Sequence, residues 1–315
     1  MSAVRVAVVG LGRLSEVGYL PVLRSLDSAE LVAVADVQEA RCARLAPGVR
    51  AYPDTMAVVA DTDVELVVVA TPPSAHLEAA DAAAGAGVPT LVEKPPAETL
   101  ADAVALAALV PRPWLGLNRR FDPDVDRLRQ RVATFRVPLD VSLEMSVLPD
   151  EWGAVTAAPE PLLDIGAHLA DLVVWLTGRE CVAVRAHRVD ETFARFEILL
   201  DGGRALVTAS HESGWRESVV VRDATGARAG LTRGGRARRI ALALSSGHRS
   251  PLVATLAAQL AAACAAVRTG AADERLATAD HGVVIMGILD AAAVSARREG
   301  AWVEPAAKRA AACSR

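Results

Sequence analysis

The residue with the clearest chemical character in this sequence is Lys94, in the stretch Thr90-Leu-Val-Glu-Lys-Pro-Pro96. Lys94 and Lys308 are the only lysines among 34 basic residues, so arginine supplies positive charge almost everywhere else. An ammonium group can release its proton, and burial readily lowers the pKa of a lysine, whereas a guanidinium stays charged. Lys94 therefore has the profile of a proton-handling group, although a solvated Glu93-Lys94 turn pair explains the motif equally well.

Three ionisable side chains share one face of a helix predicted between Leu162 and Gly178. Asp164, His168 and Asp171 are spaced i, i+4 and i+7, which brings them to the same side of a helix. This grouping suits acid-base chemistry, but a capping aspartate beside a satisfied interior histidine is the commoner explanation for a histidine taken alone. Metal binding at this spacing lacks a third convincing ligand, so we predict no metal site.

A glycine loop follows the first predicted strand, Arg5 to Val9, and a helix-like segment follows the loop, Gly10-Leu-Gly-Arg-Leu-Ser15. Gly10 permits a tight turn, and Gly12 lets the backbone approach a pyrophosphate. The N-terminus of the helix offers unpaired amides to negative oxygens. Ser15 stands where a third glycine is usual, so we expect helix and strand to pack slightly further apart.

The second predicted strand, Leu31 to Ala35, ends in Asp36, 26 residues after the first glycine of the loop. A carboxylate near this position can accept hydrogen bonds from an adenosine ribose. Asp36 can also cap the helix that starts near Gln38, and both roles can hold at once. An added 2'-phosphate would meet the carboxylate of Asp36, so NAD is favoured over NADP, although Arg41 or Arg44 could neutralise that phosphate.

Two more predicted strands end near the same edge of the sheet. Val64 to Ala70 runs into Thr71-Pro-Pro-Ser74, with Ser74 expected to cap the next helix, and Pro89 to Val92 runs into Glu93-Lys94. Doubly wound folds bind ligands at the carboxyl ends of their strands, so Lys94 reaches the edge that carries the glycine loop. The alternation of strands and helices predicts an α/β Rossmann domain with a parallel sheet over residues 1–118.

From Asn118 onward the pattern changes to consecutive strands, which predicts a mostly antiparallel sheet. We therefore expect a second, α+β domain over residues 119–315, with two helices at its end, 251–269 and 280–298. The strands are predicted over 140–147, 182–189, 193–200, 205–211 and 218–222. Their apolar residues fall on both alternations, so one sheet face is left for a partner, and we expect a homodimer or homotetramer.

Composition excludes several classes of protein. The chain is 52% hydrophobic, but its longest mild run, Leu252 to Val267, is shorter than the ~20 apolar residues of a membrane span and is predicted to be a buried helix. A net charge of −4 disfavours nucleic-acid binding, and Arg233 to Arg239 is interpreted as a solvated turn. Four widely spaced cysteines support neither a disulfide framework nor a zinc site. Without a secretory signal, we expect a cytoplasmic protein.

Five stretches, in order, resemble the Gfo/Idh/MocA oxidoreductase family, whose members include glucose-fructose oxidoreductase and inositol dehydrogenase. They are Val8-Val-Gly-Leu-Gly12, Ala70-Thr-Pro-Pro-Ser-Ala-His76, Val92-Glu-Lys-Pro95, Asn118-Arg-Arg-Phe-Asp-Pro123 and Leu163-Asp-Ile-Gly-Ala-His-Leu-Ala-Asp171. The resemblance implies a nicotinamide dinucleotide in the N-terminal domain and a sugar or cyclitol held by the C-terminal domain. It implies hydride transfer between a carbinol carbon and the nicotinamide.

The resemblance also assigns roles to residues. Lys94, Asp164 and His168 are the implied catalytic residues, with His168 as general base or acid, Lys94 on the reacting oxygen and Asp164 orienting the substrate. The implied cofactor-binding residues are Gly10, Gly12, Arg13, Leu14, Asp36, Thr71, Pro72, His76, Glu93 and Lys94. Arg120 is a further candidate for the substrate pocket, and Arg119 and Glu144 are weaker ones. Each of these last three is more often a surface or interdomain ion pair.

Two departures from the family pattern and two other functions remain open. Pro159-Glu-Pro161 stands where members often have glycines, and His281 stands where an acidic residue is common, which leaves the substrate open. A sugar- or dinucleotide-sensing regulator on the same fold is one alternative, and retention of the lysine, aspartate and histidine favours an enzyme over it. Reduction of an imine in a biosynthetic pathway is the other.

Overall fold

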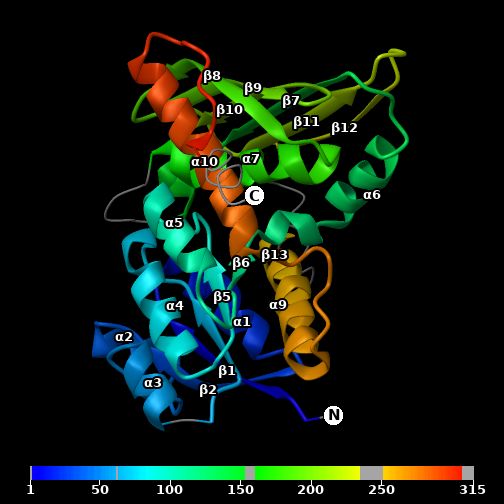
Figure 1. Cartoon of the computed structure of the whole chain (residues 1–315). Coiled ribbons are helices and arrows are strands. Elements are labelled where there is room, and N and C mark those ends of the chain that lie inside the picture. The colour runs from blue at the N-terminus through cyan, green and yellow to red at the C-terminus, as the bar shows by residue number, and fades with distance from the viewer. Residues whose placement is uncertain (1, 62, 153–159, 235–250, 307–315) are drawn as a thin grey trace. The chain divides into compact units, whose positions relative to one another are not determined.

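The computed structural model describes residues 2–61, 63–152, 160–234 and 251–306 of the chain (Figure 1). The chain forms two compact units. The first unit comprises Met1–Phe121 and Arg249–Val283, and the second comprises Asp122–His248 and Val284–Arg315.

The described part of the first unit contains a seven-stranded sheet in the order β13-β6-β5-β4-β1-β2-β3. Its strands are parallel except for β13. The other six, in the order β3-β2-β1-β4-β5-β6, follow the strand order of a Rossmann fold. The bounds are β1 Val4–Val9, β2 Ala29–Ala35, β3 Arg50–Tyr52, β4 Leu66–Val69, β5 Thr90–Glu93, β6 Trp114–Gly116 and β13 Ala277–Thr278. The predicted parallel sheet is confirmed, and β3 and β13 are additions too short for a periodic signal.

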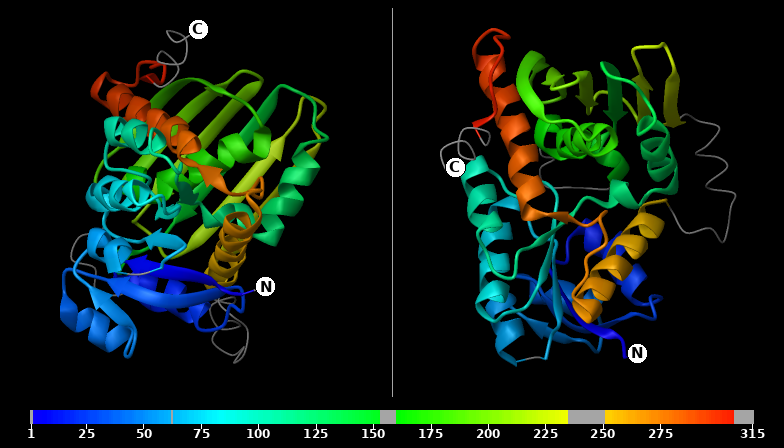
Figure 2. Two further views of the ribbon diagram at one scale, coloured as in Figure 1. Left: turned by 60° about the horizontal axis from the view of Figure 1, so that its bottom comes forward. Right: turned by 45° about the vertical axis from the view of Figure 1, so that its right-hand side comes forward.

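Helices cover both faces of this sheet, which explains why β4 and β5 are buried along their whole length. Figures 1 and 2 show α4 and α5 on one face and α1 with α9 on the other. The helical segments are η1 Ser15–Tyr19, α1 Leu20–Leu23, α2 Glu39–Leu45, α3 Thr55–Asp61, η2 Pro73–Ala75, α4 His76–Gly85, α5 Leu100–Ala107, η3 Asn118–Phe121 and α9 Pro251–Thr269.

Helix α9 belongs to the first unit, whereas the predicted division at residue 118 placed it in the second domain. Its apolar face explains the difference, because Leu256, Leu260 and Cys264 are part of the same buried cluster as the residues of β1. Polar contacts add to this packing, since Gln259 Nε2 donates to the carbonyl oxygen of Leu115 at 2.9 Å. The predicted buried helix is confirmed, but it completes the Rossmann unit.

The described part of the second unit contains a six-stranded sheet in the order β12-β11-β7-β10-β9-β8. Only the β7 and β10 pairing is parallel, so the predicted, mostly antiparallel sheet is confirmed. The bounds are β7 Leu139–Ser146, β8 Cys181–Val189, β9 Phe193–Leu200, β10 Gly203–Ser210, β11 Arg216–Arg222 and β12 Arg228–Gly234.

Helix α7, Pro161–Thr177, packs on β7, β9 and β10 of this sheet. Pro161 occupies its first position, and Gly178 ends it in the left-handed region at φ 62°, as a C-terminal glycine does. Among the described residues of the second unit, the remaining elements are α6 Pro123–Val132, η4 Pro149–Trp152 and the larger part of α10 Ala279–Arg297.

The structure also tests local predictions of a helix cap and a turn. Thr99 and Asp122 cap α5 and α6, and each accepts a backbone N–H. The predicted Ser74 cap is wrong, because Pro73 starts a 3-10 turn that contains Ser74 and α4 begins only at His76. The solvated turn predicted from Arg233 is wrong at that residue, which lies buried in β12 and donates to Asp122 at 2.7 Å. Residues 235–239 of that cluster lie outside the described residues.

Two helices among the described residues, α9 and α10, are long and apolar enough to cross a membrane by length and composition alone. In α9, 44% of the most apolar window is buried, and in α10 56% is buried. Core helices of globular proteins pass the same test, and the packing of α9 against β1 and α1 is of that kind. The two helices are therefore weak evidence for a membrane protein.

Candidate active site

The glycine loop lies beside the loop that follows β4, where the strand order of the first sheet reverses. Gly10 has φ +89°, and a Cβ at this position would lie 2.6 Å from the carbonyl oxygen of Ala70 and from the nitrogen of Thr71. A Cβ on Gly12, in contrast, would meet nothing within 4 Å. Gly10 is thus required by packing, while Gly12 leaves open space above the loop, as close approach of a pyrophosphate requires.

Ser15 ties the loop to the helix behind it. Its Oγ donates to the carbonyl oxygen of Gly10 at 2.6 Å, and the side chain is fully buried. The helix continues as the π-helical turn Ser15–Tyr19, in which the backbone N–H of Leu20 donates to Ser15. Of the other two predicted loop residues, Arg13 lies on the surface with a guanidinium nitrogen 3.2 Å from Glu16, and Leu14 packs against the core.

Asp36 is a nearly buried carboxylate at the end of β2. Its Oδ2 accepts the backbone N–H of Leu11 at 2.8 Å, and its Oδ1 accepts that of Gln38 at 2.8 Å. Arg41 lies 3.7 Å from Oδ2. The carboxylate therefore braces the glycine loop and the start of α2, and each oxygen keeps a lone pair for a ribose hydroxyl.

His76 joins the loops that follow β4 and β5. The imidazole is fully buried, with Nε2 2.9 Å from the carbonyl oxygen of Thr71 and Nδ1 3.3 Å from that of Pro96. Burial lowers the pKa of His76, because the charged ring would lose its hydration. The neutral ring has one N–H, and the shorter distance assigns it to Nε2 as donor to Thr71. The exposed Pro72 lies in this loop.

Glu93 anchors the backbone at Lys94. The carboxylate is buried at the end of β5, where Tyr19 donates its hydroxyl to Oε1 at 2.6 Å and the backbone N–H of Lys94 donates to Oε2 at 3.0 Å. Burial raises the pKa of Glu93. Gly116 makes room for the group, because a Cβ there would lie 2.7 Å from the Glu93 carboxylate. Lys94 itself is half-buried at the carboxyl edge of the sheet.

Asp164, His168 and Asp171 all lie on α7 of the second unit. Asp171 is fully buried, whereas Asp164 and His168 are partly exposed. Asp164 has a contact that the sequence did not predict: its Oδ2 lies 3.5 Å from Nε2 of His211. His211 directly follows β10, and an ionisable residue ending an apolar strand was the signal that could have drawn attention to it.

The remaining candidate residues for the substrate pocket differ in how deeply their side chains are buried. Arg120 is 1% exposed, which excludes only the surface form of the ion pair expected for it, whereas Glu144 is exposed on β7. Arg119 is half-buried. His281 accepts the backbone N–H of Thr278 at 3.1 Å, so it fills the helix-capping place that an acidic residue often takes.

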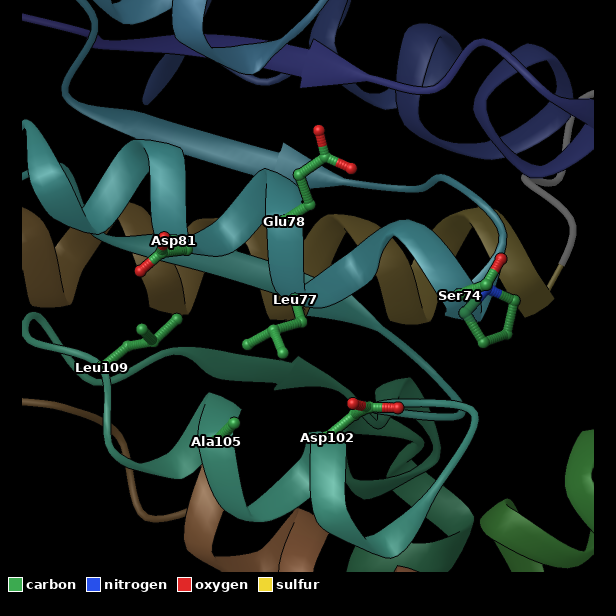
Figure 3. A pocket seen from close by; sticks show the side chains of 8 residues that line it. Ser74, Leu77, Glu78, Asp81, Asp102, Ala105 and Leu109 are labelled. Atoms are coloured by element: carbon green, nitrogen blue, oxygen red, sulfur yellow. The ribbon is translucent and has the colours of Figure 1, made fainter.

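An open hollow of about 450 Å³ lies between α4 and α5 (Figure 3). Leu77, Leu109 and Ala105 contribute apolar surface, and Glu78, Asp81 and Asp102 contribute carboxylates. It includes none of the predicted site residues. Among the described residues, no group of three or more His, Cys, Asp and Glu side chains is placed to hold a metal, there or elsewhere.

Comparison with known proteins agrees with the Rossmann fold of the first unit. Residues 4–113 match the model of an oxidoreductase family with an NAD-binding Rossmann fold. This match over residues 4–113 makes the N-terminal part of the chain similar to the Gfo/Idh/MocA family. The myo-inositol dehydrogenase Hyg17 of Streptomyces leeuwenhoekii is 36% identical over 192 residues, 58% of each chain. The chain thus aligns with less than two thirds of that relative.

Solved structures of similar fold cover nearly the whole chain. One is GenD2 from gentamicin A biosynthesis in complex with NAD, with TM-score 0.80, 23% identity, and coverage of 96% of this chain and 97% of that one. Another is the Lactobacillus casei myo-inositol dehydrogenase in complex with NAD(H) and myo-inositol, with TM-score 0.78, 18% identity and 96% coverage of both chains. At these identities the likeness shows the fold, and the family's site roles remain predictions for this chain.

A pair of glycine substitutions separates packing from cofactor binding in this loop. Gly10→Ala should lower the free energy of unfolding by more than about 1–2 kcal/mol. The positive φ of residue 10 is unfavourable for alanine, and the added Cβ would collide with the backbone of Ala70 and Thr71. Gly12→Ala should leave stability nearly unchanged and weaken NAD binding, because its methyl group fills the open space. Thermal unfolding with and without NAD measures both effects. Equal NAD affinity of Gly12→Ala and the wild type would contradict the assignment.

The buried imidazole of His76 predicts a pH dependence of stability. Its pKa in the folded protein lies below the ordinary 6.5, so the unfolded chain takes up the proton first as pH falls. Below about pH 6.5 the wild type should therefore lose stability relative to His76→Gln, by at most about 1.4 kcal/mol per pH unit. Urea unfolding at a series of pH values measures the difference. Parallel curves for the two proteins would show that His76 does not titrate in this way.

Proposed function

We propose that this protein is an NAD-dependent oxidoreductase that transfers a hydride between the nicotinamide and a CH–OH carbon of a cyclitol or sugar. The observation that carries the proposal is Lys94, anchored through Glu93 at the carboxyl edge of the sheet that holds the glycine loop. The inositol dehydrogenases among its relatives support the substrate class. An imine reductase or a sensor has no specific observation in its favour.

The chain's residues divide between holding the cofactor and handling the proton. Gly10 and Gly12 would hold the pyrophosphate and Asp36 the adenosine ribose, with Thr71, Pro72 and His76 beside them. Bound NAD supplies the hydride acceptor. His168 would take the hydroxyl proton, because histidine has an ordinary pKa near neutrality. Lys94 would bind the reacting oxygen, and Asp164 would orient the substrate.

Asp36 underlies a preference for NAD over NADP. The carboxylate is fixed by two backbone amides, and a 2'-phosphate at ~4 Å from it would cost roughly 1–4 kcal/mol. Arg41 lies close enough to offset part of that repulsion. Titration of both cofactors should show tighter NAD binding in the wild type. Asp36→Asn should reduce the difference in affinity between NAD and NADP, and Arg41→Ala should increase it. Tighter binding of NADP than of NAD by the wild type would refute the preference.

We also propose a cytoplasmic homo-oligomer, built as a dimer or tetramer on the open face of the second unit's sheet. On that face Leu199 is 40% exposed, and Leu206 and Val220 are partly exposed beside charged side chains. Exposed apolar surface of this kind often marks an interface. A light-scattering mass of one protomer at working concentration would refute the proposal.

Substitution of Lys94 tests the function. Lys94→Met should keep the fold and NAD binding, because the aliphatic stem remains and the anchoring bond uses the backbone N–H. Turnover should fall by ~10²–10⁴-fold, the usual contribution of acid-base catalysis. Lys94→Arg should not restore it, because a guanidinium cannot give up its proton near neutrality. The assay follows reduced cofactor over a panel of cyclitols and sugars.

The same pair of variants separates an enzyme from a sensor. If Lys94 served only as an ion-pair partner of a surface carboxylate, arginine would replace it well. Near-normal turnover of Lys94→Arg on a substrate of the wild type would therefore overturn the assignment. A wild type that binds NAD and turns over no member of the panel would favour the sensor.

A further inference from the structure

A histidine outside α7, His211, lies close to Asp164 of that helix. Nε2 of His211 is 3.5 Å from Oδ2 of Asp164, and the His211 side chain is 7% exposed, compared with 28% for that of Asp164. The backbone of His211 is fixed as well, because its N–H donates to the carbonyl oxygen of Thr192 at 2.8 Å. The nearly buried imidazole is therefore presented to the carboxylate by the sheet on which α7 packs.

The 3.5 Å between Nε2 of His211 and Oδ2 of Asp164 is longer than the usual 2.7–3.2 Å of N–H···O hydrogen bonds. Catalytic hydrogen bonds are often long in ligand-free structures and tighten when substrate binds.

We propose that His211 is a positioning residue for Asp164. The inference rests on the proposed function, in which Asp164 orients the substrate and acts beside His168. His211 donates from Nε2 to Oδ2 and fixes the rotation of the carboxylate that orients the substrate. The imidazole thus acts through Asp164, and its removal frees the carboxylate to rotate.

Three variants test the contact. His211→Leu removes the donor, and His211→Gln keeps an amide N–H near the position of Nε2. His187→Leu is the matched control, because His187 Nε2 lies 3.7 Å from Oε2 of Glu197, in a second histidine–carboxylate pair of the same sheet. Turnover with NAD and myo-inositol, thermal unfolding and NAD affinity are measured for each.

We expect kcat of His211→Leu to fall by about 10–100-fold with NAD affinity unchanged, because small misplacements at a reacting centre cost up to that much. His211→Gln should recover most of the loss, and His187→Leu should match the wild type. Wild-type kcat in His211→Leu would overturn the proposal. Equal loss in His211→Gln and His211→Leu, with both folded, would also overturn it.

A readout without turnover keeps this inference separate from the proposed function. The chain has six histidines, so ¹⁵N-histidine labelling gives few signals, and loss of one in His211→Gln assigns that of His211. In Asp164→Asn the Nε2 signal of His211 should shift, while that of His187 should stay. An unchanged His211 signal would overturn the contact, whether or not any substrate is turned over. A shifted signal without wild-type turnover of any cyclitol or sugar in the panel would refute only the proposed function.

Discussion

The arrangement of the first unit's site depends on one buried carboxylate, that of Glu93. Removing a carboxylate from water is costly unless hydrogen bonds replace its hydration. Here the hydroxyl of Tyr19 and the backbone N–H of Lys94 do so, at 2.6 and 3.0 Å. Because the second donor belongs to Lys94, the group that offsets the burial also fixes the backbone from which the lysine side chain projects. Burial raises the pKa of Tyr19 as well, which keeps its hydroxyl a donor.

This anchor links segments far apart in the chain. Tyr19 lies in a π-helical turn, and a Cβ on the neighbouring Gly18 would lie 2.6 Å from Cδ1 of Leu256 in α9. A side chain at residue 18 would force the Leu256 side chain of α9 to move, so the glycine favours close packing of α9 against this turn. The packing of α9, some 240 residues after the glycine loop, thus supports the turn that carries the Tyr19 hydroxyl. That dependence gives a physical reason why the Rossmann unit includes a segment from the C-terminal half.

Much of this fold could be predicted from the sequence, because buried strands ending in glycine, proline or a charge carry strong local signals. Helix α7 was predicted nearly to its ends, since Gly178 marks its close. The Ser74 cap failed because the local signal was ambiguous between a cap and a proline-initiated turn. The contacts of Glu93 with Tyr19 and of His211 with Asp164 could not be predicted, because they join residues distant in sequence through tertiary packing.

The central claim is that the chain moves a hydride between a carbinol carbon and NAD. The most direct test follows the transferred hydrogen. The protein is incubated with NAD and with cyclitols or sugars deuterated on carbon, and the mass of the reduced cofactor is measured by mass spectrometry. The account predicts that reduced cofactor forms and carries one deuterium from the substrate carbon. Reduced cofactor without deuterium, or none despite measurable NAD binding, would contradict it.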